Sequence, residues 1–213
     1  MSRIYPFESY EEYVKVQTEI NKEKLGWVYA KPRVIQRIVE EVKFAGSVLC
    51  HGTRNGAEQK MFLQHWPHAK VLGSEISDTA EQFEHTVQWD MQEPKKEWIN
   101  KWDVVYTNAF DHCIYPDQAL MTWKDQLSGD GTLFLEYAEA QSVYQASDPL
   151  EATLAEVKEM LRQAGFGLVE ELNNIVCPAN GVILKCRPTN DGIIREVVPG
   201  KDGIPPIKKG IVN

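Results

Sequence analysis

The spacing of apolar residues predicts alternating helices and strands. In residues 32–42, Val34, Ile35 and Ile38 recur with the 3.6-residue period of a helix that buries one face. A proline opens this segment and a glycine follows it, as expected near the two ends of a helix. Residues 47–52 (SVLCHG) then form a short apolar run that stops at glycine, which is typical of a buried strand.

The same alternation continues along the chain. We expect strands over residues 70–75, 85–89, 103–109 and 132–137, helices over 55–65 and 116–127, and a turn at SGDG in residues 128–131. Strands that alternate with helices form parallel βαβ units with right-handed crossovers. The pattern therefore predicts an α/β fold with helices on both faces of a mainly parallel sheet.

The last predicted strands are expected to run in a different direction from the others. We expect a helix over residues 149–164, with Pro149 at its first position and a capping box formed by Asp148 and Glu151. Two apolar segments, FGLVEEL and GVILKC, follow without an intervening helix. They are therefore predicted to pair as an antiparallel hairpin, which makes the sheet mixed.

The 213 residues suit a single domain with three regions. We expect residues 1–45 to form a helical cap, 46–187 the core, and 188–213 an appendage rich in proline and glycine. The appendage is either an arm that contacts a partner, including a second copy of the chain, or a loosely ordered tail.

Composition narrows the class of protein. The chain has 31 acidic and 23 basic residues, a net charge of −8, which disfavours binding to nucleic acid. The four cysteines form no Cys-x-x-Cys pair, and no histidine cluster has metal-ligand spacing, so we expect free thiols and no metal. Without a membrane-length apolar run or a signal peptide, the chain is expected to be cytoplasmic.

Candidate binding residues follow the predicted strands. In an open parallel sheet, ligands bind beyond the carboxyl ends of the strands. Gly52 and Gly56 follow the first strand, Glu75 ends the second, Asp90 follows the third and Asn108 lies near the end of the fourth. The glycines allow a ligand to approach the backbone, and the N–H groups of the next helix would face an anion.

The two acids suit a nucleoside. Glu75 could accept both hydroxyl protons of a ribose, and Asp90 could accept a hydrogen bond from the exocyclic amine of adenine while Met91 packs on the ring. Either acid alone is as well explained as a helix cap or a solvated loop residue. The order of the whole set along the chain is what favours a nucleoside ligand.

The segments VLCHGTRNGAE, VLGSEIS, VQWDM, WDVVYTNAFDHCIYPDQAL and LSGDGTLFLEY, taken in order, resemble class I S-adenosylmethionine-dependent methyltransferases over about residues 34–187. The resemblance implies a Rossmann-like sheet of seven strands with the last one antiparallel. It implies cofactor contacts from Gly52, Thr53 and Gly56 to the methionine part, from Glu75 to the ribose, from Ile76, Asp90 and Met91 to the adenine, and from Asn108 near the sulfonium.

The same resemblance places His112, within the segment Phe110-Asp111-His112, near the transferred methyl group. A histidine there could act as a general base for a hydroxyl acceptor, because its ordinary pKa lies near neutrality. The alternative is a structural histidine that is hydrogen-bonded within its loop. Glu136, Tyr137 and Glu139, around the end of the fifth strand, could contact the substrate or be solvated.

Two residues depart from the family pattern. Cys50 stands where the family usually has an acidic residue, and Arg54 replaces a middle glycine of the loop. We expect Arg54 to pair with Glu58 one helical turn later; the alternative is that Arg54 helps to hold the methionine carboxylate.

The function implied by the resemblance is S-adenosylmethionine-dependent methylation of a small molecule or metabolite. A nicotinamide-dependent oxidoreductase is disfavoured because the chain has neither G-x-G-x-x-G nor Tyr-x-x-x-Lys. Methylation of a nucleic-acid amine would more typically show Asn-Pro-Pro-aromatic, whereas the chain has Asn108-Ala109-Phe110. A degenerate binding module without catalysis is the remaining alternative, and Cys50 and Arg54 favour it.

Overall fold

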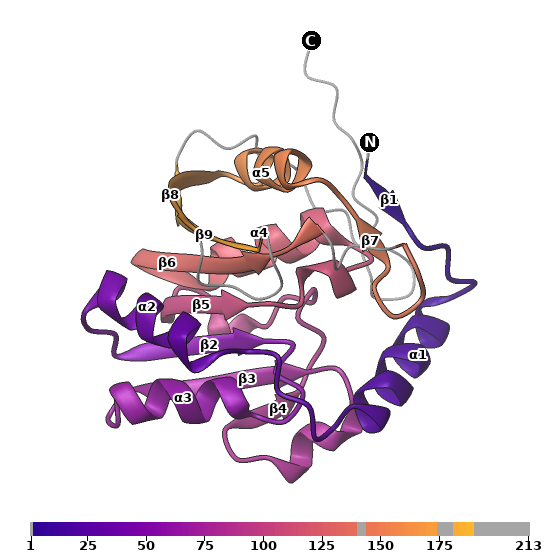
Figure 1. Ribbon diagram of the computed structural model, residues 1–213, viewed down its shortest axis with the longest axis horizontal. Helices are drawn as coiled ribbons and strands as arrows, with labels where there is room; N and C mark the ends of the chain where they lie inside the picture. Colours follow the sequence, from indigo (N-terminus) through magenta and orange to yellow (C-terminus); the bar gives the residue numbers. More distant parts are fainter. Residues whose placement is uncertain (1, 140–143, 174–180, 190–213) are drawn as a thin grey trace.

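The computed structural model describes residues 2–139, 144–173 and 181–189. Its main feature is a sheet of seven strands in the order β4-β3-β2-β5-β6-β9-β8 (Figure 1). The strands are β2 (Ser47–His51), β3 (Lys70–Glu75), β4 (Thr86–Gln88), β5 (Trp102–Thr107), β6 (Leu127–Tyr137), β8 (Phe166–Asn173) and β9 (Val182–Pro188). Neighbouring strands from β4 to β6 are parallel, and β9 runs antiparallel to both β6 and β8. The predicted mixed sheet with an antiparallel last strand is confirmed.

Helices cover both faces of this sheet. The described helices are α1 (Tyr10–Glu23), α2 (Pro32–Val42), α3 (Ala57–His65), α4 (Pro116–Gln126) and α5 (Leu154–Gln163), with short 3-10 helices η1 (Asp78–Gln82), η2 (Lys96–Trp98) and η3 (Phe110–His112). Side chains of α2 and α3 pack in one apolar cluster, and those of α4 and α5 pack in another. The sheet therefore has one core on each face.

The α2 helix illustrates why the apolar pattern predicts the elements correctly. Pro32 occupies its first turn, and Val34, Ile35 and Ile38 are fully buried against the sheet. Burying one such side chain stabilises the fold by about 1.5–3 kcal/mol. Three of them on one stripe are enough to hold a helix whose other face is polar.

Two local predictions are wrong. The first concerns the helix before β8, which begins at Leu154 and whose capping box is formed by Thr153 and Glu156, not by Asp148 and Glu151. Leu150–Glu151 instead form β7, which pairs with β1 (Arg3–Ile4). Strand pairing of a distant segment thus overrides a local capping signal.

The SGDG turn is the second wrong prediction, because β6 already begins at Leu127 and includes these four residues. The strand pairs with Trp102 at its start and is irregular before Thr132, where regular pairing with β5 resumes. The register shift between Trp102 and Val104 accommodates the extra residues.

The α1 helix lies across the carboxyl-terminal edge of the sheet (Figure 1). Ser9 caps its first turn by accepting a hydrogen bond from the backbone N–H of Glu12. The hydroxyl of Tyr10 donates to Asp90 and that of Tyr13 to the backbone carbonyl of His112. These contacts place α1 over the strand ends where ligands are expected.

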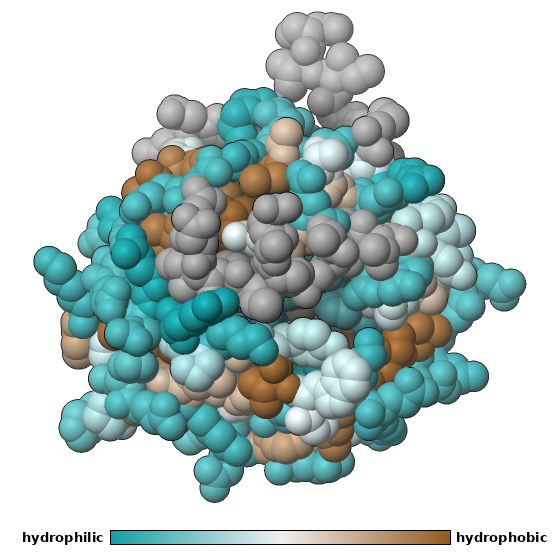
Figure 2. Space-filling model, in the orientation of Figure 1, coloured by the Kyte–Doolittle hydropathy of each residue, from teal (hydrophilic) through white to brown (hydrophobic). Residues whose placement is uncertain are grey.

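On the face shown in Figure 2, hydrophilic residues cover most of the described surface, and apolar residues occur in small separate groups. Among the described helices, none has the length and apolar character needed to cross a bilayer. The cysteines Cys50, Cys113 and Cys186 are buried free thiols, as expected, and Cys177 and the predicted appendage from residue 190 onward lie outside the described residues.

Candidate functional site

The loop after β2 bends sharply at glycine. Gly52 has a φ of 69°, and a Cβ atom on it would lie 2.5 Å from the Cβ of Ala109 in the loop after β5. Both the left-handed backbone and this close approach require glycine. Gly56, with a φ of 72°, precedes α3 as its N-cap. The two loops at the ends of β2 and β5 thus lie directly against one another.

Glu75 links this loop to the end of β3. Its Oε2 accepts a hydrogen bond of 3.0 Å from the backbone N–H of Arg54, and its Oε1 accepts one of 3.0 Å from the backbone N–H of Ser77. Burial raises the pKa of Glu75, and these two hydrogen bonds oppose that shift. A carboxylate has about four acceptor sites, so Glu75 keeps the capacity to accept further hydroxyl donors.

Asp90 is held in a similar way from the loop after β4. The Tyr10 hydroxyl donates to its Oδ2 at 2.8 Å, and the backbone N–H of Gln92 donates to its Oδ1 at 2.9 Å. Burial raises the pKa of Asp90, and the bonds from Gln92 and Tyr10 lower it. Asp90 is therefore a fixed acceptor that faces α1.

Two adjoining cavities lie at this edge of the sheet. The smaller, of about 50 Å³, is lined by Gly52, Glu75, Ile76, Asp90 and Met91 from the strand ends and by Tyr13, Gln17, Ile20 and Asn21 from α1. The larger, of about 450 Å³, is lined by Thr53, Asn108 and a group of charged residues. Gly52, Arg54, Ala109 and His112 line both cavities, which places these four residues at the junction.

All the predicted site residues except Gly56 therefore line one of the two cavities. The backbone explains the exception: Gly56 turns the chain into α3, and a Cβ on it would face Thr86 and Phe83 instead of either cavity.

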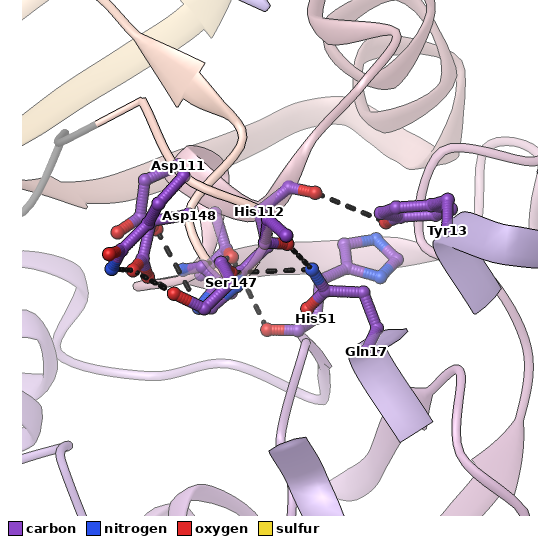
Figure 3. Close-up of polar contacts among 11 residues, drawn as sticks. Tyr13, Gln17, His51, Asp111, His112, Ser147 and Asp148 are labelled. Carbon is purple, nitrogen blue, oxygen red and sulfur yellow. Dashed lines mark hydrogen bonds and ion pairs between the residues drawn. The ribbon is translucent and has the colours of Figure 1, made fainter. Parts of the chain in front are cut away.

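His112 is oriented by its loop, as Figure 3 shows. Its Nδ1 lies 2.7 Å from the carbonyl oxygen of Ser147, which can only accept, so Nδ1 carries a proton. The amide of Gln17 on α1 donates to the same carbonyl at 3.3 Å. The Nε2 atom is consequently the one that can accept or hold a second proton.

Two carboxyl groups flank that Nε2 atom (Figure 3). Asp111 Oδ1 and Asp148 Oδ1 each lie 3.9 Å away, beyond hydrogen-bond distance but close enough to stabilise a protonated imidazole. Burial raises the pKa of Asp111. The ligand-type atoms of these three residues lie within 4.8 Å of one another, so the group also has the donors and spacing to hold a divalent cation, which no spacing in the sequence indicates.

Two further carboxyl groups line the larger cavity. Glu58 on α3 and Glu136 on β6 are 6% and 8% exposed, and burial raises the pKa of each to about 7. The Tyr106 hydroxyl donates to Glu136 Oε2 at 2.8 Å. From the sequence, Glu136 and Tyr137 could either contact the substrate or be solvated. In the structure both residues are buried.

The predicted pair of Arg54 and Glu58 is not formed. The two residues are close enough for the positive charge of Arg54 to lower the pKa of Glu58, but no ion pair joins them in the described part of the chain. The guanidinium of Arg54 lies 4.9 Å from the centre of the Tyr29 ring, in a cation–π contact. Arg54 has a φ of 44°, so the loop, and not an ordinary helical turn, sets the direction of its side chain.

Buried His51 has a structural role. Its ring lies between Ser74 Oγ at 2.7 Å and Gln126 Oε1 at 2.8 Å, and it stacks on Trp123. Burial lowers its pKa to about 4, so it is neutral at physiological pH. His112 is therefore the histidine that the site offers for proton transfer.

Comparisons with known proteins show which fold the chain has. No protein-family model matches the chain, and no curated protein matches its sequence. Among solved structures, the 1,6-didemethyltoxoflavin-N1-methyltransferase of Burkholderia thailandensis, with bound 1,6-didemethyltoxoflavin and S-adenosylhomocysteine, has a TM-score of 0.68 at 18% identity and is matched over 87% of this chain and 92% of that one.

Two other structures match over similar lengths. The [4+2]-cyclase SpnF has a TM-score of 0.66 at 12% identity, over 89% of this chain and 100% of that one. The CcbJ methyltransferase from Streptomyces caelestis has a TM-score of 0.58 at 13% identity, over 83% of this chain and 98% of that one. The chain therefore has the Rossmann-like fold of class I S-adenosylmethionine-dependent methyltransferases.

Proposed function

We propose that the protein is an S-adenosylmethionine-dependent methyltransferase that acts on a small molecule. The observation that carries the proposal is the convergence of Gly52, Glu75 and Asp90, from the ends of three strands, on one cavity that continues at His112 into a larger one. A single elongated ligand with a nucleoside at one end and a reactive group at the other suits this arrangement.

In the proposed complex, the adenosyl part occupies the smaller cavity. Glu75 accepts from the ribose hydroxyls, Asp90 accepts from the adenine amine, and Ile76 and Met91 pack on the ring. The cavity of about 50 Å³ has room for only a few waters. We therefore expect side chains of α1 that line this cavity, such as Tyr13, to move aside when adenosine binds.

The methionine part extends from the junction into the larger cavity, past Thr53 and Asn108. When bound, S-adenosylmethionine supplies a methyl group that is already electrophilic, so the protein needs mainly to orient the acceptor and exclude water. The larger cavity, of about 450 Å³, is of a size that suits a small molecule.

His112 is proposed to take the proton of a hydroxyl acceptor at Nε2. Its Nδ1 proton is fixed on the Ser147 carbonyl, and the imidazolium formed by the transfer is stabilised by Asp111 and Asp148. A divalent cation on the same three side chains would block this role. Turnover is expected to be insensitive to a chelator; loss of turnover with EDTA that Mg²⁺ or Mn²⁺ restores would reassign the three residues as metal ligands.

Calorimetric titration with S-adenosylmethionine and with NADH tests the cofactor assignment. Binding of the first alone is expected. Binding of NADH alone would indicate an oxidoreductase, and binding of neither would indicate a module that acts without this cofactor.

The [4+2]-cyclase among the matched structures illustrates that this fold carries more than one chemistry. Methyl transfer is therefore tested separately, by incubating the protein with methyl-labelled S-adenosylmethionine and small-molecule extracts. Label in a small product, with release of S-adenosylhomocysteine, is expected. Cofactor binding without any transfer would favour the degenerate binding module.

A further inference from the structure

Glu58 is an unusual carboxyl group for its position. It lies in the first turn of α3 with 6% of its surface exposed, and it lines the larger cavity. Its Oε2 is buried and has no hydrogen-bond partner among the described residues. A hydrogen bond from its own backbone N–H and the charge of Arg54 lower the pKa of Glu58, but burial outweighs both, so the ionised form is costly until a cationic partner enters the cavity.

The residues around Glu58 indicate where a cationic partner would bind. Its charge is close enough to Cys50, at the end of β2, to raise the pKa of that buried thiol. Cys50 takes the place where the resembling family usually has an acidic residue, so Glu58 brings a carboxyl group to the same strand end from the neighbouring helix. Thr53 and Asn55, in the loop between them, line the same cavity.

No ion pair to Glu58 is formed among the described residues, although the charge of Arg54 is close enough to lower its pKa. Arg54 is the nearest candidate, but its guanidinium lies over Tyr29 and its Nε is likewise buried without a partner among the described residues. The loop and the first turn of α3 thus bring an incompletely paired guanidinium and a carboxyl group with one unpartnered oxygen to the same cavity. An amino acid end, with an ammonium and a carboxylate on one carbon, complements such a pair.

We propose that Glu58 binds the α-ammonium group of the aminocarboxypropyl end of the adenosyl ligand, while Arg54 faces its carboxylate. This inference rests on the proposed function, since it assigns a binding residue for the same ligand. In this inference, Glu58 supplies the carboxyl group that is missing at Cys50. The sequence pattern alone does not assign this role, because it predicts an ion pair of Glu58 with Arg54 that would neutralise Glu58.

Two ligands separate this role from a general effect on the site. S-adenosylhomocysteine carries the amino acid end, whereas 5′-methylthioadenosine has the same nucleoside and sulfur without it. Glu58→Gln is expected to weaken binding of S-adenosylhomocysteine about tenfold or more and to change binding of 5′-methylthioadenosine less than about twofold, as measured by calorimetry at about pH 8.

Glu136→Gln is the matched control, because Glu136 is equally buried in the same cavity but already accepts the Tyr106 hydroxyl. It is expected to leave the ratio of the two affinities unchanged. Equal weakening of both ligands by Glu58→Gln, or no weakening of either, would overturn the inference. If the wild-type protein bound neither ligand, the proposed function itself would fail, which is a distinguishable result.

The pH dependence of binding gives a second readout. Charged groups that act on Glu58 come from several elements: Arg54 in the loop, Glu75 on β3 and Glu136 on β6. Cys50 and Tyr106 beside it are neutral, because burial raises the pKa of both. Burial is the largest cause of its raised pKa of about 7, so the ammonium-binding carboxylate is lost as the pH falls through neutrality.

The ratio of the affinities for S-adenosylhomocysteine and 5′-methylthioadenosine is therefore expected to fall about tenfold from pH 8 to pH 6 in the wild type and to stay flat in Glu58→Gln. The Glu136→Gln control should keep this fall but move its midpoint to lower pH, because the charge of Glu136 that raises the pKa of Glu58 is removed. A ratio that falls equally in Glu58→Gln would assign the titration to another group and contradict the inference.

Discussion

Replacing Glu136 by glutamine should stabilise the folded protein at alkaline pH. Folding raises the pKa of this carboxyl group from 4.5 to about 7, because burial outweighs the hydrogen bond from Tyr106 and the charge of Lys31. A shift of that size corresponds to about 3 kcal/mol of unfolding free energy. Between these two pH values the folded state keeps a proton that the unfolded state has lost, so the stability of the wild type falls as the pH rises.

Glutamine has no proton to lose, and its amide oxygen can still accept from Tyr106. At pH 8 the Glu136→Gln variant is therefore expected to gain up to about 3 kcal/mol, and at pH 4.5 to differ little from the wild type. Urea unfolding followed by the fluorescence of the six tryptophans measures both values. The gain corresponds to a midpoint about 1 M higher or more.

The exposed Glu81 provides the control, because Glu81→Gln should leave the unfolding midpoint unchanged at both pH values. An unchanged or lower midpoint of Glu136→Gln at pH 8 would refute the reasoning. It would mean that the hydrogen bond from Tyr106 and the charge of Lys31 outweigh burial and stabilise Glu136 as a carboxylate in the folded protein.

Three other substitutions test the remaining parts of the site. Gly52→Ala should destabilise the fold by roughly 2–5 kcal/mol, since it combines a left-handed alanine with a contact of 2.5 Å to Ala109; wild-type thermal stability would show that the loops do not meet this closely. Glu75→Ala should weaken S-adenosylhomocysteine binding by roughly 1–3 kcal/mol in calorimetry, and unchanged affinity in a folded variant would reject the ribose assignment. His112→Ala should reduce methyl transfer to a hydroxyl acceptor by about a hundredfold with cofactor affinity nearly unchanged, and full turnover would eliminate the proton-transfer role.

The sheet could be predicted from the sequence because its signals are local and repeated. The segment from Ser47 to His51 carries its strand signal in a few apolar residues closed by glycine, and the α2 stripe carries the helix period. Where the predictions failed, a distant segment decided the structure. Leu150–Glu151 look like the first turn of a helix until Arg3–Ile4 pair with them.

The residues of the candidate site likewise include some that the sequence predicts and some that it does not. Glu75 and Asp90 could be found because each ends or follows a strand, and the geometry of a parallel sheet brings such positions together. Asp148 could not be assigned to the site, because long-range hydrogen bonds from Gln17 and His112 to the Ser147 carbonyl bring its loop there. Glu58 was misassigned because helical spacing favours a pair with Arg54, whereas the left-handed backbone of Arg54 directs its side chain to Tyr29.

A crystal structure of the protein with S-adenosylhomocysteine tests most directly whether the strand ends form one binding site. We expect the ribose hydroxyls within about 3 Å of Glu75, the adenine amine at a similar distance from Asp90, and side chains of α1 moved aside. A ligand bound elsewhere, or bound here with both carboxyl groups turned away from the nucleoside, would contradict the account.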